Sequence, residues 1–226
     1  MLIEGLKKRV KESEPYIDQL KTEAPVQIGF KLTDTNEEAS LIFHDKITFE
    51  DDTSNAIGIL TMQSTTFQQI IEGEADFGAL IGRSHMSDIR PINYEVKVPE
   101  RFSEAFETVK SLMNGFFIPG KIKVRKLSKE YAGSAHGAHP IPIVYWDGLR
   151  YAWYYVPAGE VLNRDGEKDP YPQAFLILKG EGVLELEDET LKVDVGKVYY
   201  VPPNGIHKLH AETDIEMTWL AWDTPP

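Results

Sequence analysis

Gly196-Lys-Val-Tyr-Tyr-Val-Pro-Pro-Asn-Gly-Ile-His207 is the stretch that decides the fold of the second half of the chain. Val198 to Val201 are β-branched and aromatic residues, which favour strands. The two prolines end this run because proline cannot donate to a β-ladder. The Asn-Gly dipeptide that follows is typical of a tight turn. A new strand that begins at Ile206 therefore places His207 on a β scaffold, just beyond the turn.

Short strand-like runs fill the chain from Lys121 onward, separated by turn signals such as Asp147-Gly148. Regular short strands with such turns predict an all-β sandwich or barrel. The predicted strands are Lys121–Leu127, Ile141–Trp146, Arg150–Val156, Ala174–Leu178, Val183–Glu187, Leu191–Val195, Lys197–Val201, Ile206–Ala211 and Ile215–Trp222. We expect the aromatic residues of these runs to form the interior or rim of the barrel. They are Tyr151, Trp153, Tyr155, Phe175, Tyr199, Trp219 and Trp222.

The stretch Gln173–Gly182, taken together with Gly196–His207, resembles the two sequence motifs of the cupin superfamily of small β-barrels. The resemblance implies a jelly-roll barrel. In the family's first motif, a glycine is followed by two histidines, a glutamate and a later glycine, and the histidines and glutamate bind a metal. Gly159 fits the first glycine, and the second motif is matched through His207.

Most of the metal ligands that the resemblance implies are replaced. The two histidine positions fall at Asp165 and Glu167, and the glutamate position falls at Gln173. Since only His207 of the four family ligands stands in place, we favour no metal. A divalent transition metal is the alternative, because imidazole suits such ions when further ligands are available. Its candidate ligands are His207, Gln173, Glu167, Asp165, His136 and His139.

The first half mixes helices and strands. Apolar positions at near-helical spacing predict helix over residues 2–20 and over Glu100–Phe117. Strands are predicted at Val26–Leu32, Ala39–Phe43, Lys46–Glu50 and Ala56–Met62. A helix capped by Ser64-Thr65-Thr66 follows and ends at Gly73.

The run from Leu60 through the capped helix to a second short helix, Asp76–Ile81, resembles the sterol carrier protein 2 lipid-binding fold. The resemblance covers roughly Leu2 to Phe117. It implies an α+β domain, a sheet covered by helices, with an apolar tunnel for a fatty acid, a sterol or acyl-CoA. The residues expected to line it are Phe67, Ile70, Phe77, Leu80, Phe106, Met113 and Phe116. The alternative is that these side chains fill a core without a ligand.

Composition narrows the class of protein. The chain has 226 residues and no cysteine, with 24 Lys+Arg against 36 Asp+Glu for a formal net charge of -12. This charge argues against partners such as nucleic acid. No apolar run approaches the ~20 residues of a membrane span, and the N-terminus resembles no signal peptide. We therefore expect a cytoplasmic protein of two domains, 1–119 and 120–226, joined at Pro119-Gly120.

These observations favour a non-catalytic binding protein. The first domain would bind a hydrophobic small molecule, and a degenerate cupin barrel would serve as a second binding or assembly module. The rival is a metal-dependent cupin enzyme, a dioxygenase, lyase or isomerase that uses His207. The resemblance to cupins also implies a homodimer formed through the second domain.

Overall fold

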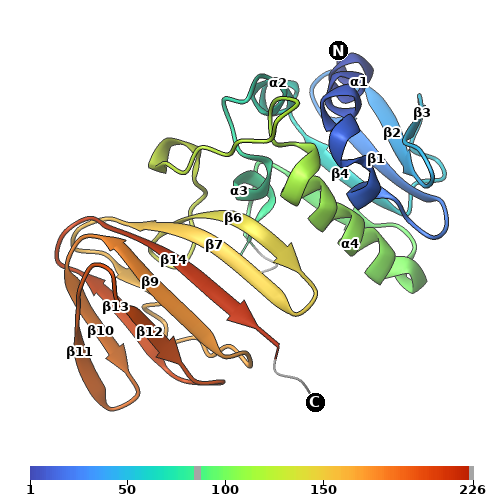
Figure 1. Ribbon diagram of the computed structural model, residues 1–226. Helices are drawn as coiled ribbons and strands as arrows, with labels where there is room; N and C mark the ends of the chain where they lie inside the picture. The colour runs from blue at the N-terminus through green and yellow to red at the C-terminus, as the bar shows by residue number, and fades with distance from the viewer. Residues whose placement is uncertain (84–87, 224–226) are drawn as a thin grey trace. The chain divides into compact units, whose positions relative to one another are not determined.

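The computed structural model describes residues 1–83 and 88–223 (Figure 1). The described residues divide into two compact units, 1–81 with 88–126 and 82–83 with 127–223. The division thus falls after Lys126, beyond the predicted boundary at Pro119-Gly120. That each half folds by itself remains a prediction. No helix among the described residues is both long and apolar enough to cross a bilayer.

The N-terminal unit is built on a five-stranded sheet of order β3-β2-β1-β4-β5. Its strands are β1 (Val26–Leu32), β2 (Glu38–Phe43), β3 (Thr48–Glu50), β4 (Gly58–Met62) and β5 (Asn93–Val96). β1 is the central strand and pairs antiparallel with β2 and parallel with β4. These three inner strands are mainly buried. β5 was not predicted, because its four residues alternate between exposed and half-buried positions and carry no apolar run.

Helices cover this sheet (Figure 1). They are α1 (Leu2–Ser13), α2 (Ser64–Glu72), α3 (Phe77–Ile81) and α4 (Phe102–Ser111), with a 3-10 segment Glu14–Leu20 after α1 and a π-helical turn Leu112–Phe116 after α4. The N-terminal unit thus combines helices with a sheet, as an α+β domain does. Assignment to the sterol-carrier fold remains a proposal.

The start of α2 is capped differently from the prediction. Ser64 lies inside the helix rather than before it, and Gln63 occupies the N-cap position without a side-chain hydrogen bond. The carboxylate of Asp34 instead accepts the Ser64 N–H at 2.8 Å and the Ser64 hydroxyl at 2.5 Å. The end of the helix is as expected, since Gly73 takes the left-handed conformation with φ of 79°.

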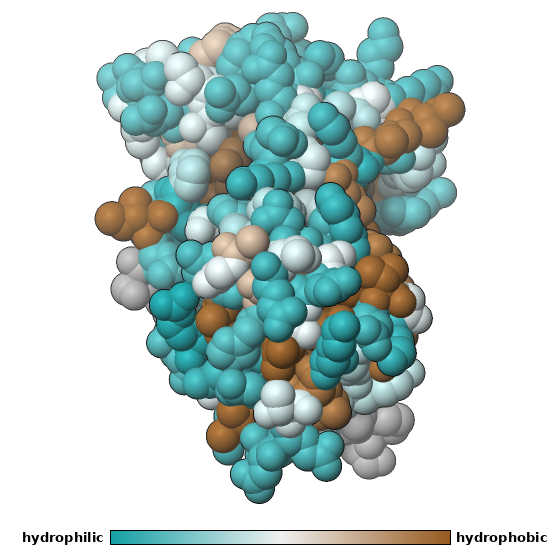
Figure 2. All heavy atoms as spheres, turned by 90° about the vertical axis from the view of Figure 1, so that its left-hand side faces the viewer, coloured by the Kyte–Doolittle hydropathy of each residue, from teal (hydrophilic) through white to brown (hydrophobic). Residues whose placement is uncertain are grey.

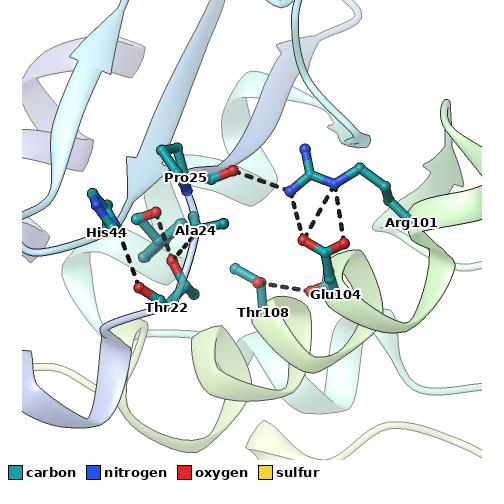
Figure 3. Close-up of polar contacts among 8 residues, drawn as sticks. Thr22, Ala24, Pro25, His44, Arg101, Glu104 and Thr108 are labelled. Carbon is teal, nitrogen blue, oxygen red and sulfur yellow. Dashed lines mark hydrogen bonds and ion pairs between the residues drawn. The ribbon is translucent and has the colours of Figure 1, made fainter.

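Arg101, just before α4, and His44, just after β2, hold the irregular segment before β1 (Figure 3). Arg101 donates to the Pro25 carbonyl at 3.1 Å and pairs with Glu104. On the other side, a ring nitrogen of His44 lies 3.1 Å from the Thr22 carbonyl. These carbonyls have no ladder partner, so side chains satisfy them.

The predicted strand Lys121–Leu127 is wrong, because the segment forms turns and irregular chain. Apolar and charged residues do alternate in this segment, but the apolar side chains face solvent: Ile122 is 80% exposed and Val124 is 73% exposed. The charged residues pack instead. Arg125 pairs with Asp76 at 2.8 Å and donates to the Met113 carbonyl at 2.6 Å. Lys123 donates to Ser13 and to the Ile118 carbonyl.

The C-terminal unit is a β-sandwich of two sheets, ordered β12-β9-β14-β7-β6 and β11-β10-β13-β8. Its strands are β6 (His139–Trp146), β7 (Leu149–Val156), β8 (Val161–Leu162), β9 (Gln173–Lys179), β10 (Gly182–Leu186), β11 (Glu189–Val193), β12 (Val198–Val201), β13 (His207–Ala211) and β14 (Ile215–Trp222). The all-β prediction is confirmed for this unit. The two-residue strand β8 was not predicted, because it is too short to produce a pattern.

The expectation of an aromatic interior holds for only some of the residues. Phe175 and Trp219 belong to the core between the sheets, and Tyr199 packs against it. Alternation along β7 places Tyr151, Trp153 and Tyr155 on the opposite face from the core residues of that strand. Trp222 likewise alternates away from the core residues of β14. The sequence pattern did not distinguish the two faces because both are rich in aromatic residues.

Candidate functional site

His207 is the first residue of β13 and is only 8% exposed. Its Nδ1 lies 3.0 Å from the Gly205 carbonyl, which can only accept, so Nδ1 carries the proton and Nε2 keeps its lone pair. Burial lowers the pKa of His207, although the Gly205 hydrogen bond and the charge of Asp169 oppose this shift. A neutral imidazole with an accepting Nε2 results.

Asn163 fixes the backbone around this histidine. Its Nδ2 donates to the carbonyls of His207 at 2.8 Å and Glu167 at 2.9 Å, and lies 3.4 Å from Nε2 of His207. Its Oδ1 accepts the Glu167 N–H at 3.0 Å. Asn163 was missed by the sequence analysis. The available signal was an asparagine in a turn, where its φ of 58° is tolerated.

Gln173, the first residue of β9, is 2% exposed. The indole Nε1 of Trp219 donates to its Oε1 at 2.7 Å. Since an indole N–H can only donate, the amide oxygen must face Trp219, and this fixes the orientation of the amide. The Nε2 of Gln173 then points elsewhere and has no hydrogen-bond partner among the described residues. It is a buried donor without an acceptor.

A row of side chains crosses the inner face of the five-stranded sheet beside Gln173. Gln173 pairs with Ala221, Ala221 pairs with Arg150, and Arg150 pairs with Tyr145. The guanidinium of Arg150 lies 4.5 Å from the ring centroid of Tyr171. Arg150 was not predicted as a site residue, because one arginine in a strand gives no signal until the strand register is known.

Two tyrosines add hydroxyl groups to this region. Tyr154 makes a T-shaped contact with Trp219, with ring centroids 6.2 Å apart. Burial raises the pKa of Tyr154. Burial also raises the pKa of Tyr145, although the charge of Arg150 opposes that shift. Both phenols therefore stay protonated at neutral pH.

The residues proposed as metal ligands do not converge. A ring nitrogen of His136 lies 3.7 Å from the Glu167 carboxylate, and Asp165 is exposed. His139 contacts the Gly133 carbonyl at 2.9 Å. Within residues 1–83 and 88–223, no three His, Cys, Asp or Glu side chains are placed to hold an ion together. The donor set described by the structure therefore does not fit the metal that the cupin fold implies.

The residues proposed to line a lipid tunnel lie in the N-terminal unit. Phe67, Ile70, Phe77, Met113 and Phe116 are buried, while Leu80 is half-buried. Phe106 is separate from this group: it is 40% exposed and stacks on Phe102 with centroids 5.6 Å apart.

The buried phenylalanines of the N-terminal unit contact one another through Phe117, which the sequence analysis did not select. Its ring lies 4.3 Å from that of Phe77 and 5.0 Å from that of Phe116. The group is therefore packed ring against ring, as aromatic residues in cores usually are. The contacts by themselves are those of a core, and ligand binding there remains a prediction.

Comparisons with known proteins agree with the architecture of the C-terminal unit. Residues 152–223 match the family model described as a cupin domain. The C-terminal unit therefore contains a cupin domain, as the sequence resemblance implied. The match does not include the N-terminal unit, whose resemblance to sterol carrier protein 2 stays a prediction. No curated protein matched.

Several solved structures are similar to part of the chain. A cupin 2 conserved barrel domain protein from Salinispora arenicola CNS-205 is 16% identical, covering 46% of this chain and 90% of that one, with a TM-score of 0.40. A conserved protein of unknown function from Streptococcus pyogenes is 20% identical over 46% and 90% of the two chains, with a TM-score of 0.39. A cupin superfamily protein from Desulfitobacterium hafniense DCB-2 is 18% identical over 46% and 85%, with a TM-score of 0.36.

Proposed function

We propose that the protein binds a small molecule between the two sheets of its C-terminal unit, against Gln173 and His207. The observation that carries this proposal is the buried Nε2 of Gln173, which has no acceptor among the described residues. Leaving such a donor unpaired costs about 1–3 kcal/mol. A bound molecule with an acceptor group would remove that cost.

The two side chains offer complementary chemistry. Gln173 presents an N–H donor, and His207 presents the lone pair of Nε2. A ligand that carries both an acceptor and a donor, such as a carbonyl compound with a hydroxyl group, would satisfy both. Aromatic side chains supply apolar contact around these polar groups, as in most small-molecule sites. These groups are sufficient to bind a ligand without catalysing a reaction.

The alternative is a metal-dependent enzyme that uses His207, a dioxygenase, lyase or isomerase. We favour binding because the donors described by the structure do not cluster. Elemental analysis of protein purified without a His tag separates the two functions. We expect no stoichiometric transition metal. A stoichiometric metal in the wild type that is lost in His207→Ala would establish the alternative.

A second proposal concerns the N-terminal unit, which we propose binds a fatty acid, a sterol-like molecule or acyl-CoA. The supporting observation is the π-helical turn Leu112–Phe116, which carries the buried Met113 and Phe116. π-helical turns are rare and occur frequently at functional sites. Incubation of delipidated protein with fatty acids and acyl-CoA, followed by native mass spectrometry, tests it. Absence of every adduct would contradict this proposal.

We also propose that the protein forms a homodimer through the C-terminal unit. β12 is an edge strand, and its Val198 and Tyr200 are 44% and 68% exposed. Exposed apolar edge strands favour association with a further chain. Sedimentation of the wild type and of Tyr200→Lys tests this, with a monomeric wild type as the contradicting result.

The test of the main proposal is native mass spectrometry of the full chain, incubated with a set of small carbonyl and hydroxyl compounds. We expect at least one adduct on the wild type that is lost in Gln173→Met, which keeps the side-chain volume and removes the donor. Trp222→Phe, which alters the opposite face of β14, should keep the adduct. An adduct that survives in Gln173→Met would place binding elsewhere.

A further inference from the structure

The inner face of the five-stranded sheet aligns an arginine with the unpartnered amide of Gln173. Ala221 is the direct neighbour of both Gln173 and Arg150. Since adjacent strands lie about 4.8 Å apart, the backbones of Gln173 and Arg150 are about 10 Å apart. Only the methyl group of Ala221 stands between them on this face. The two long side chains therefore lie on either side of one small residue.

Arg150 is oriented by its neighbours without using its hydrogen-bonding groups. Its guanidinium lies over the ring of Tyr171, at 4.5 Å, and 5.9 Å from the ring centroid of Tyr145. Stacking of this kind holds a guanidinium plane in place and leaves its edge available. The side chain is 35% exposed, so a molecule that enters from solvent can reach it.

Asp169 is the nearest counter-charge to Arg150, and the pair is loose. The distance from Arg150 Nη1 to Asp169 Oδ2 is 3.7 Å, too long for a hydrogen bond. The other oxygen of Asp169 accepts the Tyr171 N–H at 3.2 Å. The structure records no hydrogen bond from the Arg150 guanidinium to any described residue. Its parallel N–H groups match a carboxylate, which they bind with two hydrogen bonds.

We infer that the ligand of this site is a small carboxylate: its carboxylate group binds Arg150, and a second acceptor on the same molecule binds the Nε2 of Gln173. This inference rests on the proposed function and adds the chemical class of the ligand. Aromatic residues in and beside the row, Tyr145 and Trp219 among them, favour a flat body between the two acceptors. Asp169 disfavours a second negative charge near Arg150.

Three probe molecules separate the two contacts in the full chain. They are 4-acetylbenzoate, which has both acceptors, 4-acetylbenzamide, which lacks the charge, and benzoate, which lacks the second acceptor. Affinities are measured by isothermal titration on the wild type, Arg150→Met and Gln173→Met. Arg164→Met, at an exposed arginine of the same unit that pairs with Glu160, is the matched control.

We expect 4-acetylbenzoate to bind the wild type, with a loss of about tenfold or more in Arg150→Met and no loss in Arg164→Met. The weaker binding of 4-acetylbenzamide should not change in Arg150→Met, and that of benzoate should not change in Gln173→Met. Folding of each variant is checked by its circular dichroism spectrum and urea midpoint.

Other results identify which claim fails. Binding of 4-acetylbenzamide as tight as that of 4-acetylbenzoate, lost in Gln173→Met but kept in Arg150→Met, would overturn the carboxylate assignment and leave the proposed function standing. Binding that neither variant weakens would overturn both. No binding of any probe would overturn the carboxylate assignment, and the mass-spectrometric test of Gln173 then decides the proposed function.

Discussion

The indole of Trp219 holds the amide of Gln173 in one orientation. The distance from Trp219 Nε1 to Gln173 Oε1 is 2.7 Å, and both side chains are at least nine-tenths buried. The two residues lie on neighbouring strands, β14 and β9, but are not direct partners, since Trp219 is opposite Phe175. The hydrogen bond therefore runs along the diagonal of the sheet and sets which end of the amide is free.

Replacement of Trp219 by Phe should destabilise the C-terminal unit by about 1–3 kcal/mol beyond the effect of the smaller ring. The substitution removes the indole N–H and leaves the Gln173 carbonyl buried without a donor. Urea unfolding followed by circular dichroism measures the loss. Trp222→Phe makes the same change on the other face of β14 and serves as the control. Equal losses in the two variants would show that the hydrogen bond contributes little.

Arg125→Met should destabilise the N-terminal unit by about 3–5 kcal/mol, because it leaves the Asp76 carboxylate buried without its counter-charge. Burial already raises the pKa of Asp76, and Arg125 opposes that shift. Without the arginine the pKa of Asp76 rises further. A raised carboxyl pKa stabilises the folded state below the unfolded pKa, and that stabilisation is lost as pH rises.

The loss in Arg125→Met should accordingly be larger at pH 7 than at pH 4 in urea unfolding. Adding Asp76→Asn should recover part of it, because the amide oxygen can still accept the Ala79 N–H without a charge. A loss that is independent of pH, with no recovery in the double variant, would contradict this account of the pair.

We expect the N-terminal unit to need the chain as far as Lys126, because Arg125 contacts it, rather than to end at Pro119-Gly120. Residues 1–126 should be more stable than residues 1–119, since the shorter fragment lacks both Arg125 and Lys123. Residues 127–226 should give a soluble β protein by circular dichroism. Equal stability of the two N-terminal fragments would instead support the boundary at Pro119-Gly120.

His207 should make the C-terminal unit less stable in acid. Its pKa is lowered mainly by burial, so the folded state resists a proton that the unfolded chain accepts. The stability that this group contributes is present above the unfolded pKa of about 6.5 and is lost as pH falls through the folded pKa. Urea midpoints of wild type and His207→Gln should therefore converge between pH 8 and pH 5.

His210→Gln, a substitution at a half-buried histidine of the same strand that pairs with Glu185, is the control for this pH dependence. The difference between wild type and His207→Gln must shrink on acidification for the argument to hold. A difference that grows would mean that His207 is stabilised in its charged form.

Local signals in the sequence were sufficient for much of the C-terminal unit. Strand propensity, the two prolines and the Asn-Gly turn predicted β12, the turn and β13, and they placed His207 at a strand start. Each of these features acts over a few residues. The failure at Lys121–Leu127 has the opposite origin. There Arg125 and Lys123 find partners distant in sequence, which outweigh the local preference for a strand.

Which polar residues of the candidate site are neighbours depends on strand register, and a single sequence does not reveal that register. Gln173 was selected by its position in a motif, whereas Arg150 becomes its neighbour only through Ala221. Asn163 acts through backbone carbonyls, and its role follows from the path of the loop. Figure 2 shows that hydrophobic side chains also reach the surface in separate groups. The apolar character of a residue in the sequence therefore did not show whether it lies in the core or at the surface.

The central claim is that the free N–H₂ group of Gln173 binds a ligand, and the side-chain amide resonances of Gln173 report on it most directly. They are assigned in a ¹⁵N–¹H spectrum by their loss in Gln173→Met. Titration with a compound that forms a native adduct should shift both resonances with the same saturation curve as the adduct. Saturable binding of that compound with the Gln173 amide resonances unmoved would contradict the claim.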